Sequence, residues 1–121
     1  MVDDHEVVRL GMKVLLDKHQ GFTVVAEADS EEDAVEQAIL HEPDIVLMDI
    51  RLAGGSGIEA CHKIKQVLPD TKVIMLTSFA DDELLFAAIR AGATGYVLKQ
   101  VGGGDLIRSL EAIARGESML D

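Results

Sequence analysis

Apolar residues along this chain follow two patterns: short continuous runs, and longer stretches in which they recur every three or four positions. Continuous runs are typical of parallel strands buried on both faces, and the longer spacing is typical of amphipathic helices. The runs predict strands at 22–28, 44–49, 72–77 and 95–98. The periodic stretches predict helices over about 5–19, 30–42, 58–68, 84–89 and 106–116.

Polar residues and helix breakers mark the ends of these elements. Ser30, followed three positions later by Asp33, has the spacing of a capping box with Asp in place of Glu or Gln, so a helix is expected to begin there. Pro43 ends this helix, and Gly92 suits the C-cap of a later one. The segment 53–57, Ala-Gly-Gly-Ser-Gly, is predicted to be a loop.

Strands that alternate with helices across short turns indicate a mostly parallel sheet with helices on both faces. The 121 residues, 48% of them apolar, are enough for one domain with its own core. The first strand is unusual, because only Met1 and Val2 precede Asp3 and Asp4, whereas a strand usually has about five residues. We therefore expect a first strand that is cut short. Either residues upstream of Met1 are missing or the start is mis-assigned, which we favour, or the sheet is compromised.

Four apolar runs end in residues that phosphoryl chemistry requires: Asp3-Asp4, Asp49, Thr77 and Lys99. In parallel sheets, ligands bind where the carboxyl ends of the strands gather, so these side chains are expected at one edge. A carboxylate such as Asp49 can take up a phosphoryl group if the charge on the phosphoryl oxygens is neutralised. Taken alone, an acid after an apolar run is more often a strand end or a helix cap.

The same residues suit a magnesium site. Mg²⁺ binds one or two carboxylates together with water and phosphate oxygens, and Asp3, Asp4 and Asp49 could supply the carboxylates. Lys99 could pair with a phosphate oxygen, and the Thr77 hydroxyl could donate a hydrogen bond to another.

Together these motifs resemble the receiver domains of bacterial two-component response regulators over essentially the whole chain. The matching segments are Val2-Asp3-Asp4-His5-Glu6, Val46-Leu47-Met48-Asp49, Leu76-Thr77-Ser78 and Gly92-Ala93-Thr94-Gly95-Tyr96-Val97-Leu98-Lys99. The segments at 5–9, 57–59 and 95–99 look most like the subfamily with a LuxR-type helix-turn-helix effector. The resemblance implies a flavodoxin-like, doubly wound, five-stranded sheet in the order 2-1-3-4-5.

The resemblance also implies roles for individual residues. Asp49 would accept the phosphoryl group from a histidine kinase, and Lys99 would contact the phosphate. Asp4 would bind Mg²⁺ directly, Asp3 through a water, and the backbone carbonyl of Arg51 would complete the protein's share. Thr77 and Tyr96 would form a conformational switch that alters dimerisation, and DNA would be bound only by an effector domain absent from residues 1–121.

The sequence departs from the family pattern in four places. Ala53 stands where most members have Pro, so the loop after Asp49 is expected to be more mobile than usual. Gln100 replaces a Pro that favours a cis bond, and a cis bond at a non-proline residue costs about 3 kcal/mol. The third departure is the short first strand, and the fourth is that no effector domain follows Asp121 in this sequence.

Composition narrows the function classes further. Twenty-two acidic residues against 11 basic ones give a formal net charge of −11, which repels nucleic acid and anionic membranes. No apolar run is long enough to span a bilayer, and the acidic start is unlike an export signal, so we expect a cytoplasmic location. Cys61 lies in register with core positions of its helix and is expected to be buried, and the four histidines show no zinc-binding spacing and are expected to be exposed.

Three other functions fit parts of the pattern. A small magnesium-dependent phosphatase would need a second Asp two residues after Asp49, where this chain has Arg51. A flavin or nucleotide binder would need stacking aromatic residues, which make up only 3% of the chain. A receiver-like interaction module that works without phosphorylation would not need the intact set of acids, hydroxyl and lysine.

Overall fold

The computed structural model describes residues 1–19, 21–52, 54–78, 81–98 and 103–117, the last without the side chains of residues 103–105. Its helices are α1 (Glu6–Asp17), α2 (Glu31–His41), α3 (Gly57–Val67), α4 (Asp82–Ala91) and α5 (Gly103–Ala114). Its strands are β1 (Ile45–Asp49), β2 (Arg51–Leu52), β3 (Gly55–Ser56), β4 (Lys72–Thr77) and β5 (Gly95–Leu98). The predicted strands at 72–77 and 95–98 are confirmed residue for residue.

The main sheet is parallel and keeps the predicted strand order. β4 lies between β1 and β5, with Asp49 of β1 opposite Leu76 of β4. Beyond β1, Val2 forms parallel bridges to Met48 on one side and to Ala28 on the other. The segments around Ala28 and Val2 therefore take the places of strands two and one in the order 2-1-3-4-5.

The predicted strand at 22–28 is wrong in extent, since only Ala28 forms a bridge within this segment. The alternating burial of a strand is nevertheless present, because Phe22 and Val24 contact the core while Val25 is 53% exposed. The backbone that pairs with this segment is short: Ala28 donates to the carbonyl of Met1 and accepts from the N–H of Asp3. One further bond joins the two segments, from the N-terminal ammonium of Met1 to the Ala26 carbonyl at 3.2 Å. A regular ladder needs a partner along its whole length, and these bonds reach only residues 26 and 28 of the segment.

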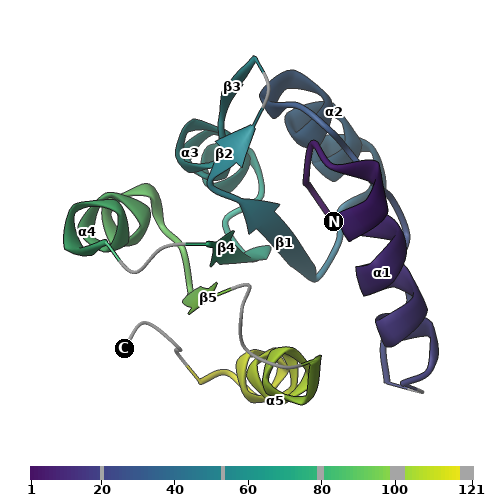
Figure 1. Ribbon diagram of the computed structural model, residues 1–121. Helices are drawn as coiled ribbons and strands as arrows, with labels where there is room; N and C mark the ends of the chain where they lie inside the picture. The colour runs from purple at the N-terminus through teal and green to yellow at the C-terminus, as the bar shows by residue number, and fades with distance from the viewer. Residues whose placement is uncertain (20, 53, 79–80, 99–102, 118–121) are drawn as a thin grey trace.

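Helices cover both faces of the sheet, in agreement with the sequence (Figure 1). On one face α2, α3 and α4 enclose a core whose most deeply buried members are Met48, Ala60, Cys61, Ile64, Val73, Met75 and Ala88. On the other face α1 and α5 enclose a second core, formed by Leu16, Leu47, Ile74, Leu76, Val97, Leu106, Leu110 and Ile113. Neighbouring residues of β4 alternate between the two cores because successive side chains of a strand point to opposite faces.

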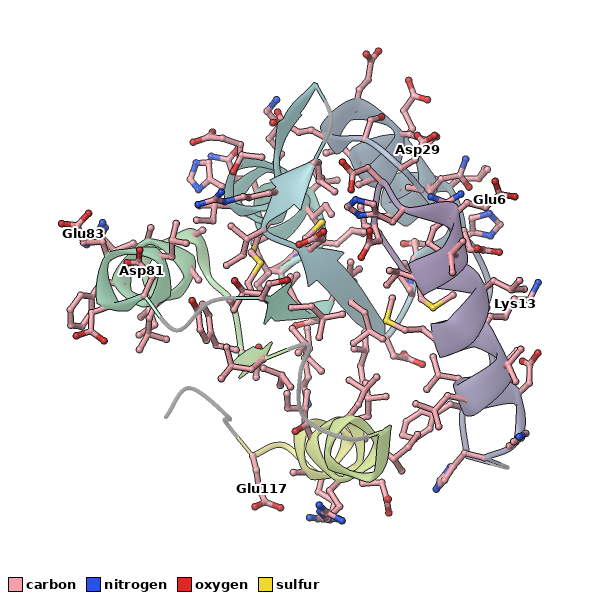
Figure 2. All side chains as sticks on the ribbon, viewed as in Figure 1. Glu6, Lys13, Asp29, Asp81, Glu83 and Glu117 are labelled. Carbon is pink, nitrogen blue, oxygen red and sulfur yellow. The ribbon has the colours of Figure 1, made fainter. Side chains whose placement is uncertain are left out.

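Helix ends follow the predicted capping chemistry. The Ser30 hydroxyl accepts a hydrogen bond from the Asp33 N–H at 3.2 Å and begins α2. Asp81 accepts from the N–H groups of Glu83 and Leu84 and begins α4, whose acidic start is labelled in Figure 2. Gly92 ends α4 in the left-handed conformation with φ of 100°, as expected for a C-cap glycine.

The segment predicted as a loop after Asp49 is a small hairpin. Arg51 pairs with Ser56 and Leu52 with Gly55 in antiparallel register. Gly54 has φ of 77°, which a residue with a side chain rarely adopts, so it permits the tight reversal. Strands of two residues are too short to produce a hydrophobic period, which is why the sequence pattern did not predict them. Ala53, on which the expectation of greater loop mobility rested, lies outside the described residues.

The single cysteine is a core residue, as predicted. Cys61 is fully buried on α3, and its thiol lies 3.5 Å from the carbonyl oxygen of Ala91. Burial raises the pKa of the Cys61 thiol to about 11, so it stays protonated near neutral pH.

Among the described residues, no helix combines the length and the apolar character that a membrane span requires.

Candidate functional site

Backbone pairing brings the first acidic pair beside the end of β1. The Val2 N–H donates to the Leu47 carbonyl at 2.7 Å, and the Asp49 N–H donates to the Val2 carbonyl at 2.9 Å. These bonds fix Asp3 next to Asp49 although 46 positions separate them in the sequence. The predicted gathering of acids at one edge of the sheet is therefore present in the fold.

Four side chains form the site: Asp3, Asp4, His5 and Asp49, each with a potential metal-ligating atom within 4.8 Å of the others. Asp3 is fully buried and Asp49 is 6% exposed, whereas the side chain of Asp4 is 23% exposed. The two deepest carboxylates thus lie at the bottom of the site, and Asp4 and His5 line its rim.

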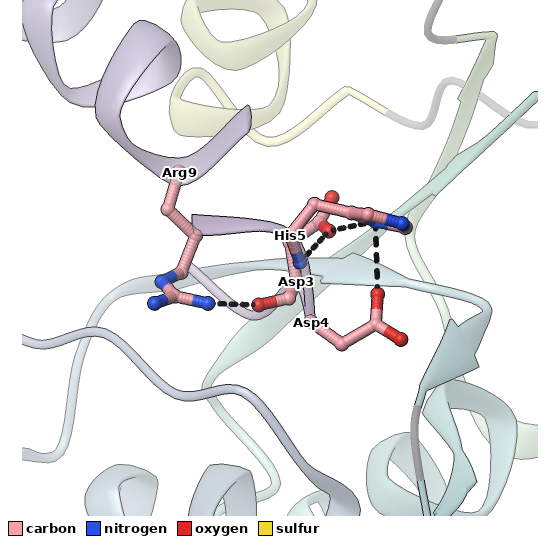
Figure 3. A network of polar contacts seen from close by, with 4 residues as sticks. All are labelled: Asp3, Asp4, His5 and Arg9. Atoms are coloured by element: carbon pink, nitrogen blue, oxygen red, sulfur yellow. Dashed lines mark hydrogen bonds and ion pairs between the residues drawn. The ribbon is translucent and has the colours of Figure 1, made fainter. Parts of the chain in front are cut away.

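His5 and Arg9 hold the acidic pair in position (Figure 3). The His5 N–H donates to Oδ1 of Asp3 at 2.9 Å, and Nδ1 of the same ring lies 3.1 Å from this oxygen and 3.0 Å from Oδ1 of Asp4. From the next turn of α1, the Arg9 guanidinium donates to the backbone carbonyl of Asp3 at 2.6 Å. The His5 N–H and Arg9 therefore position the Asp3 carboxylate and backbone, and the exposed His5 ring contacts both carboxylates.

The participation of His5 is a feature that the sequence analysis missed. The predicted exposure of His5 is confirmed, since 69% of its side chain is exposed, but the ring contacts both aspartates. The available signal was its position directly after Asp3-Asp4, at the turn from the strand end into the helix. The spacing typical of zinc ligands does not mark His5, because the other members of the site are its neighbours Asp3 and Asp4 and the distant Asp49.

The donor set fits Mg²⁺. Three carboxylates held this close repel one another, and the repulsion is strong where water is excluded, as it is around Asp3 and Asp49. A divalent cation relieves that repulsion, and carboxylate oxygens are the ligands that Mg²⁺ prefers. Asp3, Asp4 and Asp49 would hold the ion. Arg51, whose backbone carbonyl is the further predicted ligand, is the first residue of β2.

Thr77 and Tyr96 lie on the same face of the sheet. Thr77 is the last residue of β4, 4% exposed and opposite Leu98 of β5. Thr77 follows Met75 by two positions, so its side chain points to the same face of the sheet as Met75. Tyr96 and Leu84 of α4 each pack against the core on that face. The register thus places Thr77 at the same end of the sheet as Asp49, and Tyr96 shares a core with Leu84 of α4.

The predicted contact of Lys99 with phosphate, and the peptide bond before Gln100, lie outside the described residues. Lys99 directly follows Leu98, the last residue of β5, whose register partner is Thr77.

Two further residues fix the segment after Asp49. The Gly57 N–H donates to the Ile50 carbonyl at 2.8 Å, which starts α3 directly against the end of β1. Glu31 of α2 accepts from the Ser56 N–H at 2.9 Å and pairs with Lys63 of α3 at 2.7 Å. These two bonds to Glu31 lower the pKa of its carboxyl. The hairpin of β2 and β3 is therefore hydrogen-bonded to Glu31 of α2, which in turn pairs with Lys63 of α3.

A groove of about 400 Å³ lies next to the site, between α1 and the segment 27–33. It is lined by four acids, Glu6, Glu27, Asp29 and Asp33, and by two basic residues, Arg9 and Lys13, and Figure 2 labels Glu6, Lys13 and Asp29. Arg9 and Lys13 both pair with Glu27. An excess of negative charge opposes the binding of nucleotide phosphates in this groove.

The chain belongs to the response regulator receiver domain family, because the model of that family matches residues 1–111. It is 41% identical over 121 residues to the DNA-binding transcriptional activator DevR/DosR of Mycobacterium tuberculosis, covering the whole chain and 56% of that protein. It is 37% identical to the transcriptional regulatory protein LiaR of Bacillus subtilis, covering 57% of that protein. The chain thus spans a little over half the length of these curated relatives.

Solved structures support the same assignment. A LuxR-family two-component response regulator from Aurantimonas sp. SI85-9A1 superposes with a TM-score of 0.93 at 36% identity, covering 98% of this chain and 84% of that one. The isolated receiver domain of RcsB from Salmonella enterica serovar Typhimurium, solved with phosphomimetic BeF3−, gives a TM-score of 0.88 at 26% identity over 98% of this chain and 88% of that one. The doubly wound fold and the similarity to LuxR-family regulators are confirmed.

Proposed function

We propose that Asp49 accepts a phosphoryl group from the phosphohistidine of a histidine kinase. The observation that supports this proposal is the convergence of Asp3, Asp4 and Asp49 at the carboxyl ends of the strands. Such a chain is a signalling domain and not a turnover enzyme, since the group that is modified belongs to the protein itself.

The chemical step is a transfer between two nucleophiles. An oxygen of the Asp49 carboxylate attacks the phosphorus, the new O–P bond forms as the N–P bond of the phosphohistidine breaks, and the freed imidazole takes up a proton. Mg²⁺ held by Asp3, Asp4, Asp49 and the Arg51 carbonyl would neutralise charge on the phosphoryl oxygens. The burial of Asp49 limits the access of bulk water to the acyl phosphate.

Thr77 and Lys99 would contact the phosphoryl group once it is attached. Because Thr77 and Tyr96 lie on one face of the sheet, a shift of the Thr77 hydroxyl toward the phosphoryl group leaves space that the Tyr96 ring can occupy. Leu84 of α4 packs against the same core as Tyr96, so the movement would pass through this core to α4. In this way the switch pair would pass the signal to the surface of the domain.

The partners follow from this proposal. A histidine kinase would donate the phosphoryl group, and phosphorylation would favour a homodimer of the receiver. DNA would be bound only through a separate helix-turn-helix domain. The longer DevR/DosR relative is named as a DNA-binding transcriptional activator. The net charge of −11 supports this division of roles, because the receiver itself repels DNA.

Modification by a small phosphodonor tests the proposal. Acetyl phosphate with MgCl₂ is expected to add one phosphoryl group to the chain, detected by intact mass, and the Asp49→Asn variant is expected to add none. Asp44→Asn is the matched control, because Asp44 is exposed and lies at the opposite end of β1. Equal modification of the Asp49→Asn variant would contradict the proposal, because another residue would then carry the phosphoryl group. No modification of the native chain would contradict it too, and would favour the receiver-like module that works without phosphorylation.

A further inference from the structure

We infer that His5 is a direct ligand in the metal site and that it makes the site favour later first-row transition ions such as Co²⁺ or Ni²⁺ over Mg²⁺. The inference rests on the proposed metal site and extends it to a residue and to a class of ion. Its basis is the position of the ring nitrogen among the three carboxylates.

The distances in the site match the edges of one coordination shell. In an octahedron with metal–ligand bonds of about 2.1 Å, neighbouring ligand atoms lie about 3.0 Å apart. Nδ1 of His5 lies 3.0 Å from the Asp4 oxygen and 3.1 Å from the Asp3 oxygen. The ring nitrogen therefore has the spacing of a neighbouring ligand from each of the two oxygens.

Asp49 completes the group with a small adjustment. All four ligating atoms lie within 4.8 Å of one another, slightly more than the distance of about 4.2 Å across such an octahedron. Asp3 and Asp49 are buried and fixed by backbone bonds, whereas 69% of the His5 side chain is exposed. The ring is thus the part of the site that can move, and it lies on the side from which an ion enters.

A ring nitrogen changes which ion the site prefers. Mg²⁺ is suited by carboxylates, carbonyls and water, and gains little from imidazole. First-row transition ions bind imidazole well, and their affinity for mixed nitrogen and oxygen sites rises from Mn²⁺ through Co²⁺. The four-residue set of Asp3, Asp4, His5 and Asp49 is therefore a better site for such ions than the three carboxylates alone.

Metal titrations of the purified chain test this inference. We expect His5→Ala to lower the affinity for Co²⁺ by about tenfold in calorimetric titrations with CoCl₂, and to change that for MgCl₂ by less than about twofold. His62→Ala is the control, because His62 is an exposed histidine on α3, and it should change neither affinity. His5→Asn, which retains a polar side chain but lacks the ring nitrogen, should reproduce the effect of His5→Ala.

A spectroscopic measurement reports the bond directly. With Co²⁺ bound, one histidine ring should give proton resonances far outside the normal range, and these should vanish in His5→Ala and persist in His62→Ala. Equal losses for both ions, or unchanged Co²⁺ affinity in His5→Ala and His5→Asn, would overturn the inference while leaving the phosphorylation test unaffected. Co²⁺ binding that depends on His5 without modification of Asp49 would instead overturn only the proposed function.

Discussion

A side chain on Gly57 has no room, because the first turn of α3 lies directly against the backbone of Asp49. A Cβ atom at this position would overlap the Asp49 carbonyl oxygen and lie 2.9 Å from Cγ of Met48. The oxygen belongs to the backbone of a central strand and cannot move aside as a flexible side chain could. At the scale of single residues, Gly57 therefore lets the helix approach the end of β1 and fixes the path of the chain after Asp49.

Gly57→Ala is expected to destabilise the domain by about 2 kcal/mol or more, since overpacking against a fixed backbone forces main-chain shifts. Gly11→Ala is the matched control, because Gly11 lies inside α1 with nothing within 4 Å of an added Cβ. The control should gain about 0.5–1 kcal/mol from helix propensity. Urea unfolding of both variants checks this, and an unchanged midpoint for Gly57→Ala would refute it.

At the scale of secondary-structure elements, Glu31 joins three of them. Its carboxylate accepts from the Ser56 N–H of β3 and pairs with Lys63 of α3, while Glu31 itself lies in the first turn of α2. Its negative charge also suits the positive end of the α2 dipole. The hairpin that follows Asp49 is therefore held by a charged group outside its own sequence, which offsets the flexibility of Gly54 and Gly55.

The stability that Glu31 contributes should depend on pH. The pKa of Glu31 is lowered from its usual 4.5 by Lys63 and the Ser56 N–H, so the folded state binds its proton less readily than the unfolded state. Its contribution is fully present above pH 4.5 and is lost as the pH falls through the lowered value. Glu31→Gln should therefore lower the urea midpoint at pH 7, and its difference from the native chain should shrink below pH 4.5.

The control for this measurement is Glu36→Gln, since Glu36 is an exposed residue on the same helix. It should leave the midpoint nearly unchanged across the same pH range. A constant difference between Glu31→Gln and the native chain at every pH would show that the loss comes from packing and not from the charge.

At the scale of the whole molecule, two cores share one sheet. β4 contributes Val73 and Met75 to the core under α2, α3 and α4, and Ile74 and Leu76 to the core under α1 and α5. If either helical layer lost its packing, the sheet face that it covers would be exposed to water. The same strands also carry the other core, so that core would be weakened too. The domain should therefore unfold as one cooperative unit.

Truncation on either face tests this cooperativity. Ile64→Ala on α3 and Leu110→Ala on α5 should each cost about 2–5 kcal/mol, because both side chains are buried. Val67→Ala, 56% exposed on α3, should cost less than about 0.5 kcal/mol. For every variant, far-UV circular dichroism and the fluorescence of Tyr96, the only tyrosine, should report the same midpoint. Separate transitions for the two faces would contradict a shared core.

Much of this fold was predictable from local pattern. The strands β4 and β5 and the caps at Ser30 and Gly92 follow from hydrophobic period and from turn chemistry that acts over a few residues. The hairpin formed by β2 and β3 was not predictable, because its strands are too short to show a period. The extent of pairing near Ala28 also depended on a partner far away in the sequence.

The sequence by itself determined the type of fold and the chemical character of the site, because apolar runs that end in Asp3-Asp4, Asp49 and Thr77 define both the strands and the groups at their ends. Tertiary structure decided what surrounds them. The approach of Asp3 to Asp49 depends on the pairing of Val2 with β1, and the hydrogen bond from the Ser56 N–H to Glu31 depends on how α2 is placed against the sheet. Such placements come from packing between distant segments, which no local pattern records.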